Sequence, residues 1–259
     1  MIYVLIAVTS LFASFLTFFS GFGLGTILLP VFAIYYPLPI AVALTACVHL
    51  LNNLFKLGLL YKNINWKIGF KFGIPSLIAA FFGAWALKDI DKLKSAIVSY
   101  SLNGNEFIIT WPGLIIGSLI ILFAIIELVP KLSEFSFHEK YLIPGGLLSG
   151  FFGGFSGHQG SIRSAFLLRL KLERSVFIAT GVFIACLVDV IRISFYTSFS
   201  ELKNGESNFA LLLLAIFTAW IGAFVGNKLF KKTSLQFFKW FVGIFMLAMG
   251  ILIILGIIR

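Results

Sequence analysis

The feature that most constrains this chain is a series of apolar segments, repeated along its whole length, each close to the size of a membrane crossing. About 20 consecutive apolar residues are needed for a helix to span the ~30 Å hydrocarbon core of a bilayer. Hydrophobic residues make up 60% of the sequence and charged residues only 12%, a composition unlike that of soluble domains. We therefore expect an all-α polytopic membrane protein with a single transmembrane domain over residues 1–259.

Two of the apolar segments are too short to cross a membrane, and both follow a polar, glycine-rich break. The breaks read SGFGLG and SGHQGS, and the short segments are 25–36 and 161–171. Broken helices are tolerated at membrane depth only where protein or a water-filled cavity satisfies the freed backbone groups. The full set of expected helices is 2–19, 25–36, 38–60, 67–87, 111–129, 141–154, 161–171, 173–198, 208–228 and 236–257.

The two breaks align without a gap when the sequence is shifted by 136 residues. The shift places Gly21 on Gly157 and Asn53 on Asp189, so hydropathy and polar residues agree between the halves. Each half is expected to contain a broken re-entrant helix pair followed by three transmembrane helices. The two repeats are expected at about 1–130 and about 140–259.

Loop charges favour re-entrant pairs over pairs that cross. With re-entrant pairs, most Lys and Arg in the loops fall on one face, which the positive-inside rule assigns to the cytoplasm. Both termini then lie outside the cytoplasm, and three crossings per half make the two repeats inverted, as in many secondary transporters. The alternative, a first segment that crosses by itself, stays open because that segment is long enough to span.

One stretch of the first half points to a family. In FFSGFGLGTILLPVFAIYYPLPIAVALTACVHLLNNLFK, a glycine-rich break is followed by a proline and then by a helix with Thr and Asn. This pattern resembles the first repeat of the TauE/SafE family of sulfite and sulfonate exporters. The resemblance implies a secondary transporter that exports a small anion (sulfite, an organosulfonate or a related organic acid) by alternating access. The residues that carry it are Gly21, Gly23, Gly25, Pro30, Thr45 and Asn52 or Asn53.

The second break departs from the family's run of glycines because it contains His158, Gln159, Ser161 and Arg163. Both short helices start directly after a break, so their free N–H groups and positive dipole ends should attract an anion inside the membrane. The predicted substrate-binding residues are Gly21, Gly23, Gly25, Ser156, Gly157, His158, Gln159, Ser161 and Arg163.

Each of these assignments has a structural alternative. The glycines and serines are also the residues that permit close helix packing in membranes. Arg163 opposes the dipole of its own helix, which a bound anion would compensate, but pairing with Asp189 is the other interpretation. His158 is either an anion donor or proton carrier, or a satisfied structural histidine.

A second group of candidates lies on the long helices. Asp189 and Arg192 are three residues apart, hence on one helical face, and predict either an ion pair or a gate and proton relay. His49 and Asn53 share a face in the first half and join the gating or relay group. Lys56 is close enough to a helix end to extend its ammonium to the membrane surface.

Several function classes are disfavoured. There is no G-x-x-x-x-G-K-[ST] motif, so transport is expected to be secondary, with proton or membrane-potential coupling. Basic residues are scattered through loops, which fits membrane anchoring rather than nucleic-acid binding. No cofactor and no metal are expected, and the partners are a small anion and the lipids of a bacterial inner (plasma) membrane. The alternative to a non-enzymatic exporter is an intramembrane enzyme or metal-ion transporter using His49, His158 and Asp189.

Overall fold

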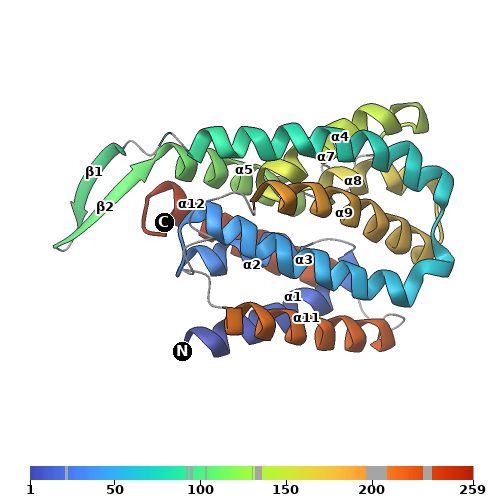
Figure 1. The fold of residues 1–259 in the computed structure, drawn as a ribbon, viewed down its shortest axis with the longest axis horizontal. Coiled ribbons are helices and arrows are strands. Elements are labelled where there is room, and N and C mark those ends of the chain that lie inside the picture. Colours follow the sequence, from blue (N-terminus) through green and yellow to red (C-terminus); the bar gives the residue numbers. More distant parts are fainter. Residues whose placement is uncertain are drawn as a thin grey trace.

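A computed structural model of the chain describes residues 1–20, 23–91, 93, 96–102, 104–129, 131, 136–196, 209–229 and 235–258. Helices dominate this structure, and most of them run side by side along its long axis (Figure 1). Within the described residues, five helices are long and apolar enough to cross a membrane: Ile40–Asn63, Trp66–Ile90, Trp111–Leu128, Arg174–Tyr196 and Phe209–Leu229. The expected all-α polytopic membrane fold is confirmed.

The helix bounds lie within a few residues of those expected from the apolar segments. The α-helices are α1 (Ile2–Ser20), α2 (Leu24–Ala33), α3 (Leu38–Leu60), α4 (Trp66–Asp91), α5 (Trp111–Leu128), α7 (Leu142–Ser156), α8 (Gly160–Leu167), α9 (Arg174–Tyr196), α11 (Phe209–Leu229) and α12 (Leu235–Ile254). Short 3-10 turns adjoin them: η1 (Tyr61–Asn63), η2 (Glu139–Tyr141) and η3 (Leu168–Leu170).

Both expected breaks interrupt the helices. Helix α7 ends at Gly157, which has a φ of 83° and donates its N–H to the carbonyl oxygen of Gly153. Gly23, directly before α2, has a φ of 122°. Glycine adopts these positive φ values without the steric cost that other residues pay, which is why the chain changes direction at these points. Each break therefore joins a long helix to a short one that packs against it.

Close contacts between backbones hold the helices around the breaks. Gly146, Gly150 and Gly154 form one face of α7, where an added Cβ would lie only 2.0–2.4 Å from carbonyl oxygens of α4. Gly222 of α11 is as close to α1, at 2.1 Å from the carbonyl oxygen of Leu11. Small residues allow this approach because helix association in membranes depends on tight van der Waals packing. The first broken pair, α1 and α2, thus packs on α11, and the second, α7 and α8, packs on α4. Helices α3 and α9 pack against each other between the two pairs.

A β-hairpin between α4 and α5 was not anticipated. Strands β1 (Ala96–Leu102) and β2 (Asn105–Thr110) pair antiparallel and project from the end of the molecule where both termini lie (Figure 1). Leu102 pairs with Asn105, and Gly104 between them has a φ of 79°. The sequence signal was the Asn103-Gly104 dipeptide, which favours two-residue hairpin turns. The hairpin is tied to the residues after α12 by the Tyr100 hydroxyl, which donates to the carbonyl oxygen of Leu255 at 2.7 Å.

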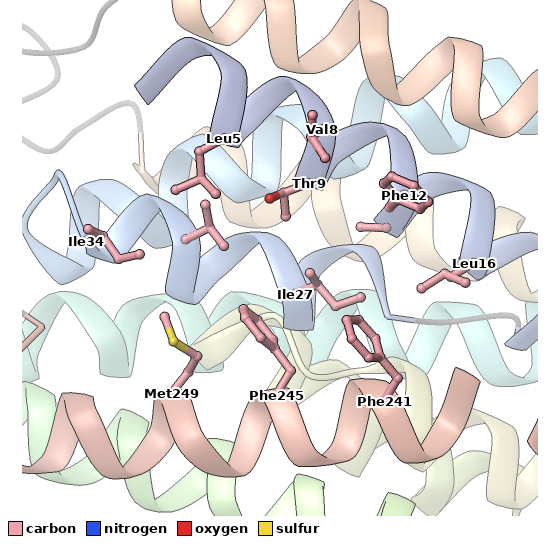
Figure 2. A pocket seen from close by; sticks show the side chains of 12 residues that line it. Leu5, Val8, Thr9, Phe12, Leu16, Ile27, Ile34, Phe241, Phe245 and Met249 are labelled. Atoms are coloured by element: carbon pink, nitrogen blue, oxygen red, sulfur yellow. The ribbon is translucent and has the colours of Figure 1, made fainter. Parts of the chain in front are cut away.

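A large apolar groove of about 490 Å³ lies between α1, α2 and α12 (Figure 2). Its wall includes Leu5, Phe12, Ile27 and Phe245, and among the described residues of its lining Thr9 alone has a polar side chain. Such a surface suits lipid or hydrophobic packing. It offers no charge or set of donors for a small polar ligand, so the candidate site lies elsewhere.

Candidate functional site

The two helix breaks meet at a small polar cavity near the middle of the helices. Its volume is about 10 Å³, which is enough space for about one water molecule. Among the described residues that line it, Arg163 and His49 are the ionisable ones and none carries a carboxylate. The lining residues are Gly23, Gly25, Thr26, His49, Gly157, Gln159, Gly160, Ser161 and Arg163.

The starts of α2 and α8 both border this cavity, and neither is capped by a side chain. The first intrahelical hydrogen bonds run from Ile27 N to Gly23 O and from Arg163 N to Gln159 O, each at 3.0 Å. The N–H groups of 24–26 and 160–162 therefore have no partner within their own helices. Two positive helix ends thus converge on one small space, which is an arrangement suited to an anion.

Arg163 adds a full positive charge to the cavity wall. Its side chain is only 4% exposed, and Nη1 donates to Gln159 Oε1 at 3.4 Å. The absence of a side chain at Gly181 on α9 makes room for it, because an added Cβ there would lie 3.3 Å from Arg163 Nε. The guanidinium is therefore fixed by its surroundings in the one region where both helix starts are also positive.

The hydroxyl groups around the cavity are engaged with the protein. Thr26 Oγ1 donates to the carbonyl oxygen of Gly23 at 2.8 Å, and Ser156 Oγ donates to that of Phe152 at 3.1 Å. Ser161 Oγ donates to Glu127 Oε1 at 2.6 Å. These bonds favour the structural interpretation of the hydroxyls, which shape the helix starts and leave backbone N–H groups as the donors nearest the cavity.

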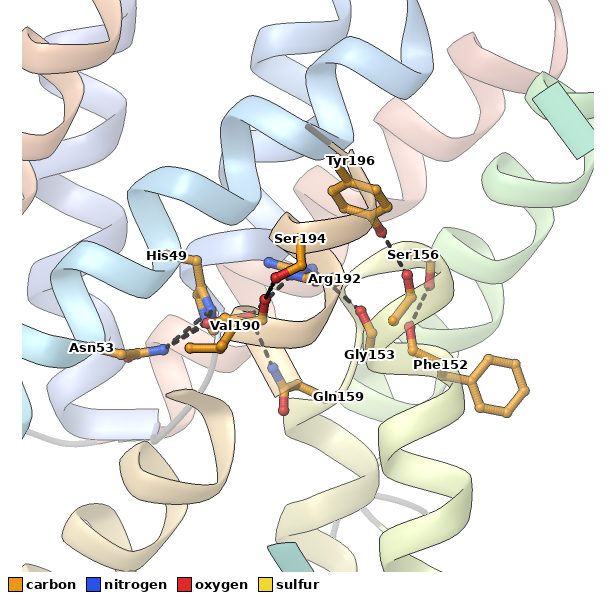
Figure 3. A network of polar contacts seen from close by, with 12 residues as sticks. His49, Asn53, Phe152, Gly153, Ser156, Gln159, Val190, Arg192, Ser194 and Tyr196 are labelled. Carbon is orange, nitrogen blue, oxygen red and sulfur yellow. Dashed lines mark hydrogen bonds and ion pairs between the residues drawn. The ribbon is translucent and has the colours of Figure 1, made fainter. Parts of the chain in front are cut away.

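Asp189 is the centre of a buried polar network with His49, Asn53, Gln159 and Arg192, which are labelled in Figure 3, and two of these partners, His49 and Gln159, also line the cavity. Its carboxylate is fully buried, with His49 Nδ1 at 2.5 Å and Arg192 Nε at 3.0 Å. Amide groups complete the shell: Gln159 Nε2 lies 3.3 Å and Asn53 Nδ2 3.4 Å from its oxygens. The expected Asp189–Arg192 ion pair is therefore present, and it is joined to His49 and Asn53 on α3. The network links α3, α9 and the second break.

Lys56 and Arg192 each reach the helix that precedes a break. Arg192 Nη1 donates to the carbonyl oxygen of Gly153 in α7 at 3.3 Å. Lys56 Nζ donates to Thr17 Oγ1 in α1, and its side chain is only 2% exposed. The prediction that Lys56 reaches the membrane surface was wrong, because the side chain turns inward to the Thr17 hydroxyl. Basic groups near a helix C-terminus are favoured by the dipole.

Comparison with known protein families identifies the chain. The family model of the sulfite exporter TauE/SafE matches residues 6–253, nearly the whole sequence. The chain belongs to the TauE/SafE family. Searches of curated proteins and of solved structures found no match. As a TauE/SafE member, the protein is an integral membrane transporter of the sulfite and sulfonate type, and the resemblance seen in the first repeat is confirmed.

The structure of this TauE/SafE member brings most of the predicted binding residues to the cavity. Gly23, Gly25, Gly157, Gln159, Ser161 and Arg163 line it, as does His49 from the predicted gating group. Ser156 and His158 lie behind the wall, with His158 Nδ1 at 3.2 Å from Ser156 Oγ and its ring stacked on Phe123. Gly21 falls outside the described residues.

Two contributors were missed from the sequence. Gly160 lines the cavity through its backbone, and Glu127 of α5 is buried against Ser161. The signal for Glu127 was a single carboxylate within an apolar membrane helix, which is costly unless it serves the protein. Among the described residues, no group of three or more His, Cys, Asp and Glu side chains is arranged to hold a metal ion.

Proposed function

We propose that the protein is a secondary transporter that binds a small sulfur oxyanion between the starts of α2 and α8 and exports it by alternating access. The observation that carries the proposal is that two uncapped helix starts and the Arg163 guanidinium border one cavity whose lining, in the described part of the chain, contains no carboxylate. Bound oxygens would receive backbone N–H groups from both helices and a charge-assisted bond from Arg163. Gly25, Gly157 and Gly160 allow the backbone to approach the anion.

The substrate class follows from the lining. The described residues of the wall are glycines, polar side chains and Thr26, and none of them is a large aliphatic or aromatic hydrocarbon side chain that would pack against a carbon chain. This lining favours sulfite itself over longer organosulfonates. The cavity is smaller than any such anion, so binding requires α2 and α8 to separate. A site that has to open before it can be loaded or emptied is consistent with alternating access.

The movement we propose is a rocking of two inverted repeats. Four helix boundaries correspond at one 136-residue offset, which is also the separation of Asn53 and Asp189. They are the ends of α1 and α7, the starts of α2 and α8, and both the starts and the ends of α3 and α9. The contacts correspond as well, since Thr17, which Lys56 reaches, is equivalent to Gly153, which Arg192 reaches. Figure 1 places both termini at one end, as three crossings per inverted half require.

The Asp189 network is the gate in this proposal. Asn53 and Asp189 occupy equivalent positions in the two repeats and are in contact across their interface at 3.4 Å. Separation of α3 from α9 would break that contact and the 2.5 Å contact of His49 with the same carboxylate. These two polar contacts therefore hold the closed state of the transporter. They lie next to the site and must be replaced by other contacts when the site opens.

Sulfite flux in proteoliposomes tests the assignment of Arg163. Arg163→Gln removes the charge but keeps a polar side chain of similar reach. Loss of a hydrogen bond to a charged group is worth about 1.5–3 kcal/mol, so sulfite affinity should fall by roughly 10-fold to 100-fold. Arg169→Gln is the matched control, because Arg169 is an exposed residue of η3 six positions later. Equal flux in both variants, at equal protein content and melting temperature, would contradict the proposal.

Accessibility labelling tests the orientation. Single cysteines at Met1 and within 61–66, introduced after replacement of Cys47 and Cys186, should react with an impermeant thiol reagent from opposite faces of the membrane. The terminus is expected outside the cytoplasm. Labelling of both positions from the same face would exclude the re-entrant arrangement of α1 and α2.

A further inference from the structure

His49 belongs both to the cavity and to the Asp189 network. Its side chain is 12% exposed, whereas that of Asp189 is fully buried. The Cδ2 edge of the ring faces Gly25 in the first turn of α2, where an added Cβ would lie 3.9 Å away. The Nδ1 edge contacts Asp189 at 2.5 Å. A proton that enters the cavity therefore meets His49 before it can reach the carboxylate.

The contact with Asp189 determines which ring nitrogen exchanges a proton. Asp189 is paired with Arg192 and is therefore ionised, and an ionised carboxylate only accepts hydrogen bonds. His49 Nδ1 must donate, which leaves Nε2 as the atom that takes up or releases a proton. Asn53 Nδ2, which lies 3.1 Å from His49 Nδ1 and 3.4 Å from Nε2, also lies 3.4 Å from Asp189 Oδ2, so the amide keeps an acceptor whether or not Nε2 carries a proton.

The charged groups around His49 act on its ring proton in opposite directions. Asp189 favours a proton on the ring. The positive start of α2, which the ring faces at Gly25, opposes it, as do the cations Arg192 and Lys56 and the Arg163 guanidinium in the same cavity lining. The described charged and titratable groups around His49 are Asp189, Arg192 and Cys186 on α9, Arg163 on α8, and Lys56 and Cys47 on α3, while α2 contributes only Gly25 and Thr26. An anion in the cavity would shift this balance toward the protonated ring.

The other two histidines lack these features. His158 is 2% exposed, stacks face to face on Phe123 at 5.2 Å, and has no carboxylate among its contacts in the described residues. His138 lies in an exposed turn at the start of η2. His49 is thus the histidine whose position joins solvent-accessible space, a carboxylate and the candidate anion site.

We propose that His49 is a proton site coupled to the anion site, so that one proton binds and moves with each anion. The inference rests on the proposed function and extends it. Protonation gives His49 Nε2 a hydrogen and the ring a positive charge beside the cavity, while Nδ1–H stays on Asp189. Because coupling between binding sites is reciprocal, the proton raises anion affinity and the anion raises proton affinity by the same factor. The net direction of transport then depends on the sum of the anion gradient and the proton gradient.

Sulfite uptake into proteoliposomes under an imposed pH gradient tests this coupling. With acid outside, the wild-type protein should accumulate sulfite several-fold, while the sulfite uptake that remains in His49→Gln should no longer respond to the pH gradient. Protonation of sulfite in solution affects the wild type and every variant equally, because all are measured in the same solutions, so it does not contribute to the difference between them. His138→Gln should behave as wild type. Accumulation by His49→Gln that equals that of wild type, or its loss in His158→Gln alone, would overturn the inference.

A measurement on the wild-type protein covers the case in which His49→Gln does not fold. Nitrogen-15 NMR of labelled histidine reads the protonation of each ring, with the signals assigned through His138→Gln and His158→Gln. Added sulfite at constant pH should increase the protonated fraction of His49, and no change would refute the coupling. Failure of the proposed function would look different, because the wild-type protein would then show neither sulfite exchange nor uptake.

Discussion

Replacement of Asp189 by Asn should destabilise the protein strongly, because it leaves a buried cation without its counter-charge. Arg192 is 1% exposed and lies 3.0 Å from the carboxylate. At this distance of 3.0 Å and an effective dielectric constant of 20, the attraction is about 5.5 kcal/mol. Removal of one partner from a buried ion pair costs about 3–5 kcal/mol. At about 2–4 °C per kcal/mol for a chain of this size, the melting temperature should fall on the order of 10 °C.

The assay is thermal unfolding of the purified protein in detergent, followed for wild type, Asp189→Asn, Arg192→Met and the double variant. The double variant should recover most of the loss, because it contains no unpaired buried charge. Asp89→Asn is the control, since Asp89 is an exposed carboxylate near the end of α4. An Asp189→Asn melting temperature indistinguishable from that of the control would refute the reasoning. So would a double variant as unstable as Asp189→Asn alone.

Two further predictions separate the cavity from the helix packing. Gly25→Ala should leave the melting temperature unchanged or raised, since the new Cβ meets nothing closer than Gly157 O at 3.7 Å, yet it should reduce sulfite exchange at least 10-fold by filling the cavity. Normal exchange in Gly25→Ala would argue against the site. Gly150→Ala should nearly abolish folded protein in membranes, because its Cβ would lie 2.0 Å from Ser76 O. Gly58→Ala is the control for both, with nothing within 4 Å of the new Cβ, and equal yields of Gly150→Ala and Gly58→Ala would contradict the packing argument.

The sequence by itself determined the helices and the two breaks. Hydropathy and helix length are local properties, so α3 and α9 were expected within two residues of their observed ends. The breaks were visible because Gly and Ser interrupt apolar runs, and the cavity indeed forms where they meet. The Asp189–Arg192 pair was expected for a similar reason, since residues three apart on a helix share a face.

Only the tertiary structure decided which of these residues share one site. His49 and Asp189 are 140 residues apart and meet at 2.5 Å because α3 packs against α9, a contact that no local pattern specifies. Likewise Lys56 turns inward because Thr17 of α1 is within its reach, and His158 faces Phe123 rather than the cavity lining. Hydropathy indicates that a helix is buried in the membrane or in the protein, but it does not specify which helix lies next to it. Which helices become neighbours depends on tertiary packing, such as the glycine contacts of α7 with α4, and the packing of α3 on α9 placed His49 beside both the candidate anion site and a carboxylate.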